Sequence, residues 1–202
     1  MIALIDYGAG NLTSVKKALT FLGADFAVPA SPAELREVRG VIVPGVGHFA
    51  ATAALEGAWY DAISAAAKAG TPLLGICLGM QWLFEGSDEA PEVRGLGMMR
   101  GRITRLKGDA EHRMKVPHVG WNAIEFTQPA RLLDGLQTGA QVYFTHSFAA
   151  PVTSDTAAAT THCATFASVV ERDNIYGVQF HPEKSSDAGL QMIRNFLGAC
   201  GR

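Results

Sequence analysis

Cys77 stands where a buried strand meets the start of a helix, a position at which a thiol can act as a nucleophile. The apolar run at residues 73–76 fits a strand, and the residues after Cys77 favour a helix. Gly75 and Gly79 flank the cysteine in a Gly-x-Cys-x-Gly pattern, the thiol form of the nucleophile elbow. Such a turn needs glycine where backbones approach closely, and it places the sulfur at a helix N-terminus, which favours the thiolate. An isolated cysteine is otherwise a small buried hydrophobic residue, so the rest of the chain must decide.

A cysteine nucleophile needs a base, and six histidines are available: His48, His112, His118, His146, His162 and His181. His181 has the best context, because His181-Pro182-Glu183 follows an apolar run at residues 176–180. Alternate residues of an extended chain point to the same side, so Glu183 can orient the imidazole of His181 and stabilise its charge. The alternative is a polar turn after a strand.

Attack on a carbonyl also needs donors for the developing oxyanion. The segment Pro44-Gly45-Val46-Gly47 follows an apolar run and supplies backbone N–H groups if these face the sulfur. A common strand-end turn is the alternative. The turn at Cys77, the loop at residues 44–47 and the His-x-Glu motif at 181–183 together indicate an acyl-transfer site. Their joint occurrence is a more specific signal than any one of them alone.

Length and composition fit one α/β domain over residues 1–202. The net charge of −2 and the absence of a basic cluster argue against binding to nucleic acid or to an anionic membrane. The amino terminus looks like a strand and not a signal peptide, and no apolar segment approaches a bilayer span. Three widely spaced cysteines suit a reducing compartment and form no recognisable zinc site. We therefore expect a cytoplasmic protein.

Strands and helices alternate in the first half of the chain. Apolar runs indicate strands at residues 2–6, 26–28, 41–43 and 73–76, and helical patterns begin after Asn11, after Ser31 and across residues 50–69. This alternation predicts a parallel sheet with helices on both faces and ligands at the carboxyl ends of its strands. Gly8-Ala9-Gly10 is no dinucleotide fingerprint, because Thr13 stands where the third glycine belongs.

The second half has a different texture, with short β-like runs broken by glycine and proline. These runs cover residues 101–106, 122–126, 141–147, 157–162, 168–172 and 175–180, and a last helix covers 187–197. We expect the runs either to extend the same sheet with antiparallel strands or to form a small flanking sheet.

Several motifs together resemble a known family. Gly-Ile-Cys-Leu-Gly-Met-Gln at 75–81, Pro-Gly-Val-Gly at 44–47 and Gln-Phe-His-Pro-Glu at 179–183 resemble the class I, or triad, glutamine amidotransferases. Residues 6–12, 115–122, 143–148 and 184–185 narrow the resemblance to the glutaminase subunits of imidazole glycerol phosphate synthase. The resemblance covers essentially the whole chain. It implies a flavodoxin-like α/β fold with a largely parallel central sheet and antiparallel strands added in the C-terminal half.

The resemblance also implies roles for individual residues. Cys77 would attack the glutamine amide, His181 would protonate the departing ammonia and then activate water, and Glu183 would hold His181. Gly45 and Val46 correspond to the oxyanion strand, and glutamine-binding positions correspond to Gly47, Gln81, Glu89, His146, Ser147 and Phe148. Glu89 suits the α-ammonium group of glutamine on physical grounds. No cofactor and no metal are implied.

Family members deliver ammonia to a (β/α)₈ cyclase, which needs about 250 residues and must be a separate partner in a heterodimer. The positions that face this cyclase correspond to Asn11, Trp121, Tyr143 and Lys184. We expect the lone chain to hydrolyse glutamine poorly until the liganded cyclase binds, because the Gly45 peptide can turn inward or outward. Three alternatives stay open: a glutaminase serving a different synthase, a cysteine peptidase-like relative, and a catalytically inactive binding subunit.

Overall fold

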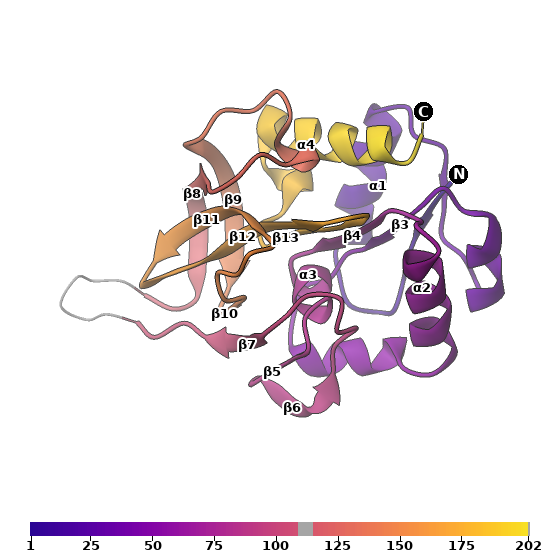
Figure 1. Ribbon diagram of the computed structural model, residues 1–202, viewed down its shortest axis with the longest axis horizontal. Coiled ribbons are helices and arrows are strands. Elements are labelled where there is room, and N and C mark those ends of the chain that lie inside the picture. The colour runs from indigo at the N-terminus through magenta and orange to yellow at the C-terminus, as the bar shows by residue number, and fades with distance from the viewer. Residues whose placement is uncertain (109–114, 202) are drawn as a thin grey trace.

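A nine-stranded sheet runs through the middle of the molecule in the computed structural model, which describes residues 1–108 and 115–201 (Figure 1). One of the six histidines considered as a base, His112, lies outside these residues. The sheet order is β2-β1-β3-β4-β13-β12-β11-β8-β9. It combines a parallel half with an antiparallel half, as the sequence predicts.

The parallel half consists of β2 (Phe26–Ala27), β1 (Ile2–Leu4), β3 (Gly40–Val43), β4 (Leu73–Ile76) and β13 (Ile175–Val178). Every residue of β1, β3, β4 and β13 is buried, which matches the continuous apolar runs typical of parallel strands covered on both faces. Ile76 at the end of β4 lies opposite Val178 at the end of β13. This register places the residues that follow the two strands at the same edge of the sheet.

The antiparallel half consists of β12 (Ala164–Arg172), β11 (Thr156–His162), β8 (His118–Phe126) and β9 (Ala140–His146). A separate four-stranded sheet contains β10 (Phe148–Ala149), β7 (Arg102–Arg105), β5 (Gly86–Ser87) and β6 (Ala90–Arg94). Both arrangements left open by the sequence are therefore present. The run expected at residues 175–180 differs in part, because β13 is antiparallel to β12 but parallel to β4. The sequence reading missed β5 and β6, because β5 is two residues long and β6 contains Pro91 and two charged residues.

Helices cover both faces of the large sheet (Figure 1). On one face α1 (Leu12–Phe21) and α4 (Ser186–Ala199) pack into one hydrophobic core, and the short 3₁₀ helices η3 (Arg131–Leu133) and η4 (Pro182–Lys184) lie beside α4. On the other face η1 (Pro32–Glu37), α2 (Ala58–Lys68) and α3 (Leu78–Trp82) contribute to a second core. As predicted, Asn11 caps α1, accepting a hydrogen bond from the Ser14 backbone.

The single helix expected over residues 50–69 is wrong. A 3₁₀ helix, η2 (Phe49–Leu55), ends before Gly57, and α2 begins after it. Gly57 has a φ of +67°, a left-handed conformation that interrupts a right-handed helix. The alanine-rich sequence on both sides hid this break from a periodicity argument.

Candidate active site

Cys77 occupies the sharp strand-to-helix turn that its flanking glycines predict. It lies between β4 and α3 with a φ of +52° and a ψ of −105°, a region that costs energy for a residue with a side chain. Its backbone N–H donates to Val178 at 2.7 Å. A Cβ atom at Gly79 would overlap the Val43 carbonyl, and one at Gly75 would lie 2.6 Å from the Gly79 oxygen. The packing therefore requires both glycines.

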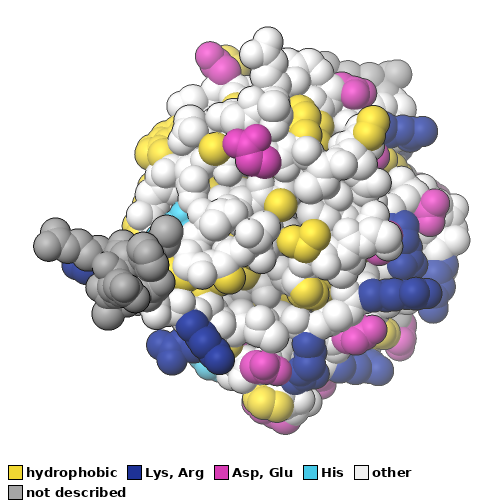
Figure 2. All heavy atoms as spheres, turned by 60° about the vertical axis from the view of Figure 1, so that its left-hand side comes forward, with side chains coloured by type: hydrophobic (Ala, Val, Ile, Leu, Met, Phe, Trp, Pro, Cys, Tyr) yellow, Lys and Arg dark blue, Asp and Glu magenta, His cyan; other side chains and the backbone are white. Residues whose placement is uncertain are grey.

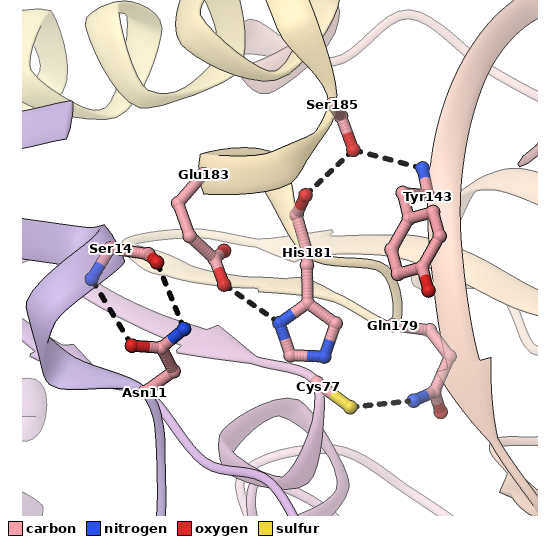
Figure 3. A network of polar contacts seen from close by, with 8 residues as sticks. All are labelled: Asn11, Ser14, Cys77, Tyr143, Gln179, His181, Glu183 and Ser185. Carbon is pink, nitrogen blue, oxygen red and sulfur yellow. Dashed lines mark hydrogen bonds and ion pairs between the residues drawn. The ribbon is translucent and has the colours of Figure 1, made fainter. Parts of the chain in front are cut away.

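His181 and Glu183 form a buried pair beside the cysteine. His181 Nδ1 donates to Glu183 Oε1 at 2.8 Å, and the two side chains are 2% and 1% exposed. Figure 3 shows the free Nε2 edge of the His181 ring on the side of Cys77, and Nε2 has no hydrogen-bond partner among the described residues. Burial alone lowers the pKa of His181, but the contacts with Cys77 and Glu183 raise it to about 10. The imidazole is thus held in its protonated form at neutral pH.

Backbone contacts hold His181 in place from strand β9. Its N–H donates to the Tyr143 carbonyl at 2.9 Å. The Ser185 hydroxyl donates to the His181 carbonyl at 2.6 Å and accepts from the Tyr143 N–H at 2.9 Å (Figure 3). Ser185 therefore positions His181, whereas at the sequence level it is only part of the 184–185 motif and has no assigned role.

The buried side chain of Gln179 also contacts the Cys77 sulfur. Its Nε2 lies 3.7 Å from the Cys77 sulfur, and its Oε1 accepts from Gln81 Nε2 at 3.1 Å (Figure 3). The alternation of Gln179, His181 and Glu183 is the signal that would have found it, since alternate residues of an extended segment share a side. Because Gln179 is fully buried, water does not compete for its amide, and this strengthens the hydrogen bond from Nε2 to the sulfur.

The loop after β3 meets the elbow through Gly45. Its carbonyl accepts a hydrogen bond from the Leu78 N–H at 3.3 Å. Because the C=O and N–H of a trans peptide point in opposite directions, the Val46 N–H faces away from Leu78 in this conformation. A Cβ atom at Gly45 would overlap the Tyr7 hydroxyl and lie 2.8 Å from the Leu78 side chain, so only glycine fits. In this conformation the loop presents the Gly45 carbonyl to the turn at Cys77, where the sequence predicts that backbone N–H groups of residues 44–47 face the sulfur.

A cavity of about 300 Å³ opens above Cys77. The predicted site residues that line it are Val46, Gly47, Cys77, Gln81, Glu89, His146, Ser147 and Phe148, together with the unpredicted Leu78, Pro117 and Thr145. His181 and Glu183 lie behind Cys77 and do not line it, nor does Gly45.

Glu89 and Gln81 are already engaged within the protein. One carboxylate oxygen of Glu89 accepts from the Phe49 N–H at 2.8 Å, at the start of η2. The Gln81 amide donates to the Phe148 carbonyl at 2.9 Å as well as to Gln179. Both side chains are thereby held at fixed positions on the cavity wall. The cavity presents the Cys77 sulfur and the Glu89 carboxylate, and the protonated His181 lies beside that sulfur, which is chemistry suited to acyl transfer from a small amide that carries an ammonium group.

The four residues predicted to face a partner lie at or near the surface. Trp121 is 52% exposed and pairs across β8 and β9 with Tyr143, their ring centroids 6.1 Å apart. Asn11 and Lys184 are exposed. In Figure 3 Asn11 and Tyr143 lie on opposite sides of the His181–Glu183 pair.

Within residues 1–108 and 115–201, no cluster of histidine, cysteine and acidic side chains is arranged to hold a metal ion. None of the helices in that part of the chain is long and apolar enough to span a membrane.

Comparisons with known proteins agree with one another. A family model described as "Glutamine amidotransferase class-I" matches residues 3–200. The imidazole glycerol phosphate synthase subunit HisH of Desulfitobacterium hafniense is 48% identical over 200 residues, which cover 97% of this chain and 93% of that protein. HisH of Geobacillus thermodenitrificans is 46% identical over 205 residues, covering 98% and 95%. A crystal structure of a glutamine amidotransferase superimposes with a TM-score of 0.78 over 100% of both chains at 19% identity, a likeness of fold alone.

Proposed function

Because this chain belongs to the class-I glutamine amidotransferase family, and within it to the HisH subunits of imidazole glycerol phosphate synthase, we propose that the cavity above Cys77 binds L-glutamine. The chain is the glutamine-hydrolysing subunit of that enzyme in histidine biosynthesis, and the complete complex acts as a lyase. We take residues 1–202 as a single glutaminase domain. The three widely spaced cysteines suit the cytoplasm, where we place the protein.

Cys77, His181 and Glu183 are the proposed catalytic residues. The sulfur of Cys77 attacks the side-chain amide carbon of glutamine, and His181 gives its Nε2 proton to the departing ammonia, which leaves a thioester. His181 then takes a proton from water, and the resulting hydroxide attacks the thioester carbon and displaces the sulfur. This releases glutamate and restores the Cys77 thiolate beside the protonated His181. The buried hydrogen bond to Glu183 orients the imidazole throughout and stabilises it whenever it is protonated. The observation that best supports this proposal is that the cavity, the Cys77 sulfur and the charged imidazole of His181 lie at the same edge of the sheet.

Glutamine recognition is proposed to use the remaining cavity residues. Glu89 offers a carboxylate to the α-ammonium group, while Gly47, Gln81 and the segment His146–Phe148 shape the wall. Val46 and Leu78 are the proposed oxyanion donors once the Gly45–Val46 peptide has turned over. That rotation would release the Leu78 N–H from the Gly45 carbonyl and turn the Val46 N–H to the same side as the Leu78 N–H.

The second subunit of the enzyme is a cyclase that receives the ammonia, and we propose that it forms a heterodimer with this chain. Trp121, Tyr143, Asn11 and Lys184 are proposed to contact it. Trp121 and Val119 are both exposed and lie two residues apart on β8, which supports this assignment, because neighbouring exposed apolar side chains and aromatic residues are typical of interfaces. Figure 2 shows hydrophobic side chains scattered over the β8–β9 side, with lysines and arginines gathered toward its edges.

Substitution of the nucleophile tests the proposed function directly. In the complex with its cyclase, Cys77→Ala should abolish synthesis driven by glutamine and leave synthesis driven by added ammonium salt close to the wild-type rate. The reason is that only the first route needs the thioester. Product formation with each nitrogen source is the measurement. Loss of both activities in a folded variant would show that Cys77 is structural.

A further inference from the structure

Three histidines from neighbouring strands gather beside the cavity: His118 on β8, His146 on β9 and His162 on β11. His118 and His146 face each other in the β8–β9 register and are 4% and 7% exposed. The His118 ring stacks on His162 with centroids 4.0 Å apart. Of the three, His146 alone lines the cavity. The mechanism above uses neither His118 nor His162.

The chemistry of the partners decides where the protons lie on His118 and His146. The Phe148 carbonyl, 2.9 Å from His146 Nδ1, only accepts, so His146 carries a proton on Nδ1. In a neutral ring Nε2 is then an acceptor, and His118 Nδ1 at 3.0 Å must donate to it. His118 Nε2 in turn accepts from Asn122 Nδ2 at 3.3 Å. The result is a one-way relay, Asn122 to His118 to His146 to the Phe148 carbonyl.

The relay requires neutral imidazole rings at His118 and His146, and the surroundings of both rings favour the neutral form. Burial, together with the neighbouring His146 and His162, lowers the pKa of His118 to about 3. Burial and the charges of His162 and His181 lower the pKa of His146 to about 4, although its bond to the Phe148 carbonyl acts in the opposite direction.

The relay ends on the wall of the cavity. The Phe148 carbonyl accepts from His146 on one side and from the Gln81 amide at 2.9 Å on the other. Two donors hold this carbonyl in one orientation, which fixes the segment from His146 to Phe148 where it borders the cavity. Removing the His118 donor would leave His146 Nε2 as a buried acceptor without a partner and free the ring to turn away from Phe148.

We propose that His118 is a positioning residue for glutamine binding, which acts by donating from Nδ1 to His146 and so holding the 146–148 segment against the cavity. This role rests on the proposed function, because it assumes that glutamine occupies the cavity. It predicts an effect on binding rather than on the chemical step, since His118 touches neither the sulfur nor the cavity.

Two substitutions at one position separate the donor from the rest of the side chain. Asparagine places an N–H donor near the position of Nδ1, whereas leucine has a similar size and no donor. In the complex with liganded cyclase, His118→Leu should raise the KM for glutamine about tenfold with kcat within about twofold of wild type. His118→Asn should keep KM within about threefold of wild type. A KM in the asparagine variant as high as in the leucine variant would overturn the proposal, as would a fall in kcat at unchanged KM.

His162→Leu is the matched control for packing. It removes the ring that stacks on His118 and leaves the relay intact. Its KM should stay near the wild-type value. A rise equal to that of His118→Leu would show that the aromatic cluster as a whole, and not the donor, shapes the cavity.

Nuclear magnetic resonance of the full chain labelled with ¹⁵N-histidine reads the relay without any assay of activity. At neutral pH the signals lost in His118→Asn and in His146→Gln should both belong to neutral rings protonated on Nδ1. A proton on Nε2 of either ring, or an imidazolium, would overturn the proposal whatever KM values the activity variants give. If wild-type complex releases no ammonia from glutamine while this signature is present, the proposed function fails and the relay stands.

Discussion

At the scale of single residues, the charge on His181 links catalysis to stability. Glu183 is its hydrogen-bonded partner and contributes, with Cys77, to the raised pKa of about 10. Glu183 Oε2 has no hydrogen-bond partner among the described residues, so the positive imidazole is what compensates the buried carboxylate. The stability that the His181–Glu183 pair contributes therefore depends on pH.

Glu183→Gln should destabilise the protein most at low pH. A group whose pKa is raised on folding stabilises fully below its unfolded value, near 6.5, and loses that contribution as pH rises through the folded value of about 10. The free energy of unfolding of wild type minus variant should therefore be larger at pH 6 than at pH 10 by about 1 kcal/mol or more. Urea titrations at the two pH values measure this difference. A gap that widens toward pH 10 would contradict the assignment.

At the scale of elements, the elbow is held by contact between the first turn of α3 and the end of β3. The Gly79 position touches the Val43 carbonyl so closely that no Cβ fits. Because backbone atoms on both sides belong to buried elements, neither can move without disturbing the sheet.

Gly79→Ala should therefore destabilise the protein by about 2 kcal/mol. Gly198 supplies the matched control, because it lies in helix α4 with open space around its Cβ position. Gly198→Ala should be neutral or stabilising by up to about 1 kcal/mol, since alanine favours helix. Chemical unfolding of the two variants gives both values. Equal stability of Gly79→Ala and wild type would show that the turn relaxes easily.

At the scale of the whole molecule, the Gly45 peptide and the proposed partner surface both bear on the proposed mechanism. The Gly45 carbonyl accepts from the Leu78 N–H, so one of the proposed oxyanion donors is occupied in this conformation. The Tyr143 carbonyl on β9 accepts from the His181 backbone, and its side chain lies beside exposed Trp121. A partner that contacts Trp121 would therefore be linked to His181, the proposed catalytic histidine, through Tyr143 on strand β9.

The isolated chain should release ammonia from glutamine slowly, and liganded cyclase should raise that rate by about 100-fold or more, because an oxyanion donor is worth that much. The comparison needs one assay with and without the cyclase and its nucleotide. Full activity of the lone chain would show that the Gly45 peptide turns over without help.

Much of the fold and of the site was predictable because the signals are local. Continuous apolar runs identified β1, β3, β4 and β13, and the Gly-x-Cys-x-Gly pattern identified the turn at Cys77. Helical periodicity failed at residues 50–69, because a single glycine with a positive φ breaks the helix without changing the apolar spacing. The sequence did not predict strands β5 and β6, because their pairing with neighbouring strands, and not their composition, defines them.

By itself the sequence singled out the side chains that we propose carry the chemistry, because Cys77, His181 and Glu183 lie in short motifs whose spacing reflects local geometry. The tertiary structure alone decided how those motifs meet. Strand β13 pairs with β4 across the intervening chain, and this brings Gln179, 102 residues away, to the sulfur. The Gly45 carbonyl on Leu78, and His118 behind His146, likewise depend on pairing between distant segments, which no local pattern encodes.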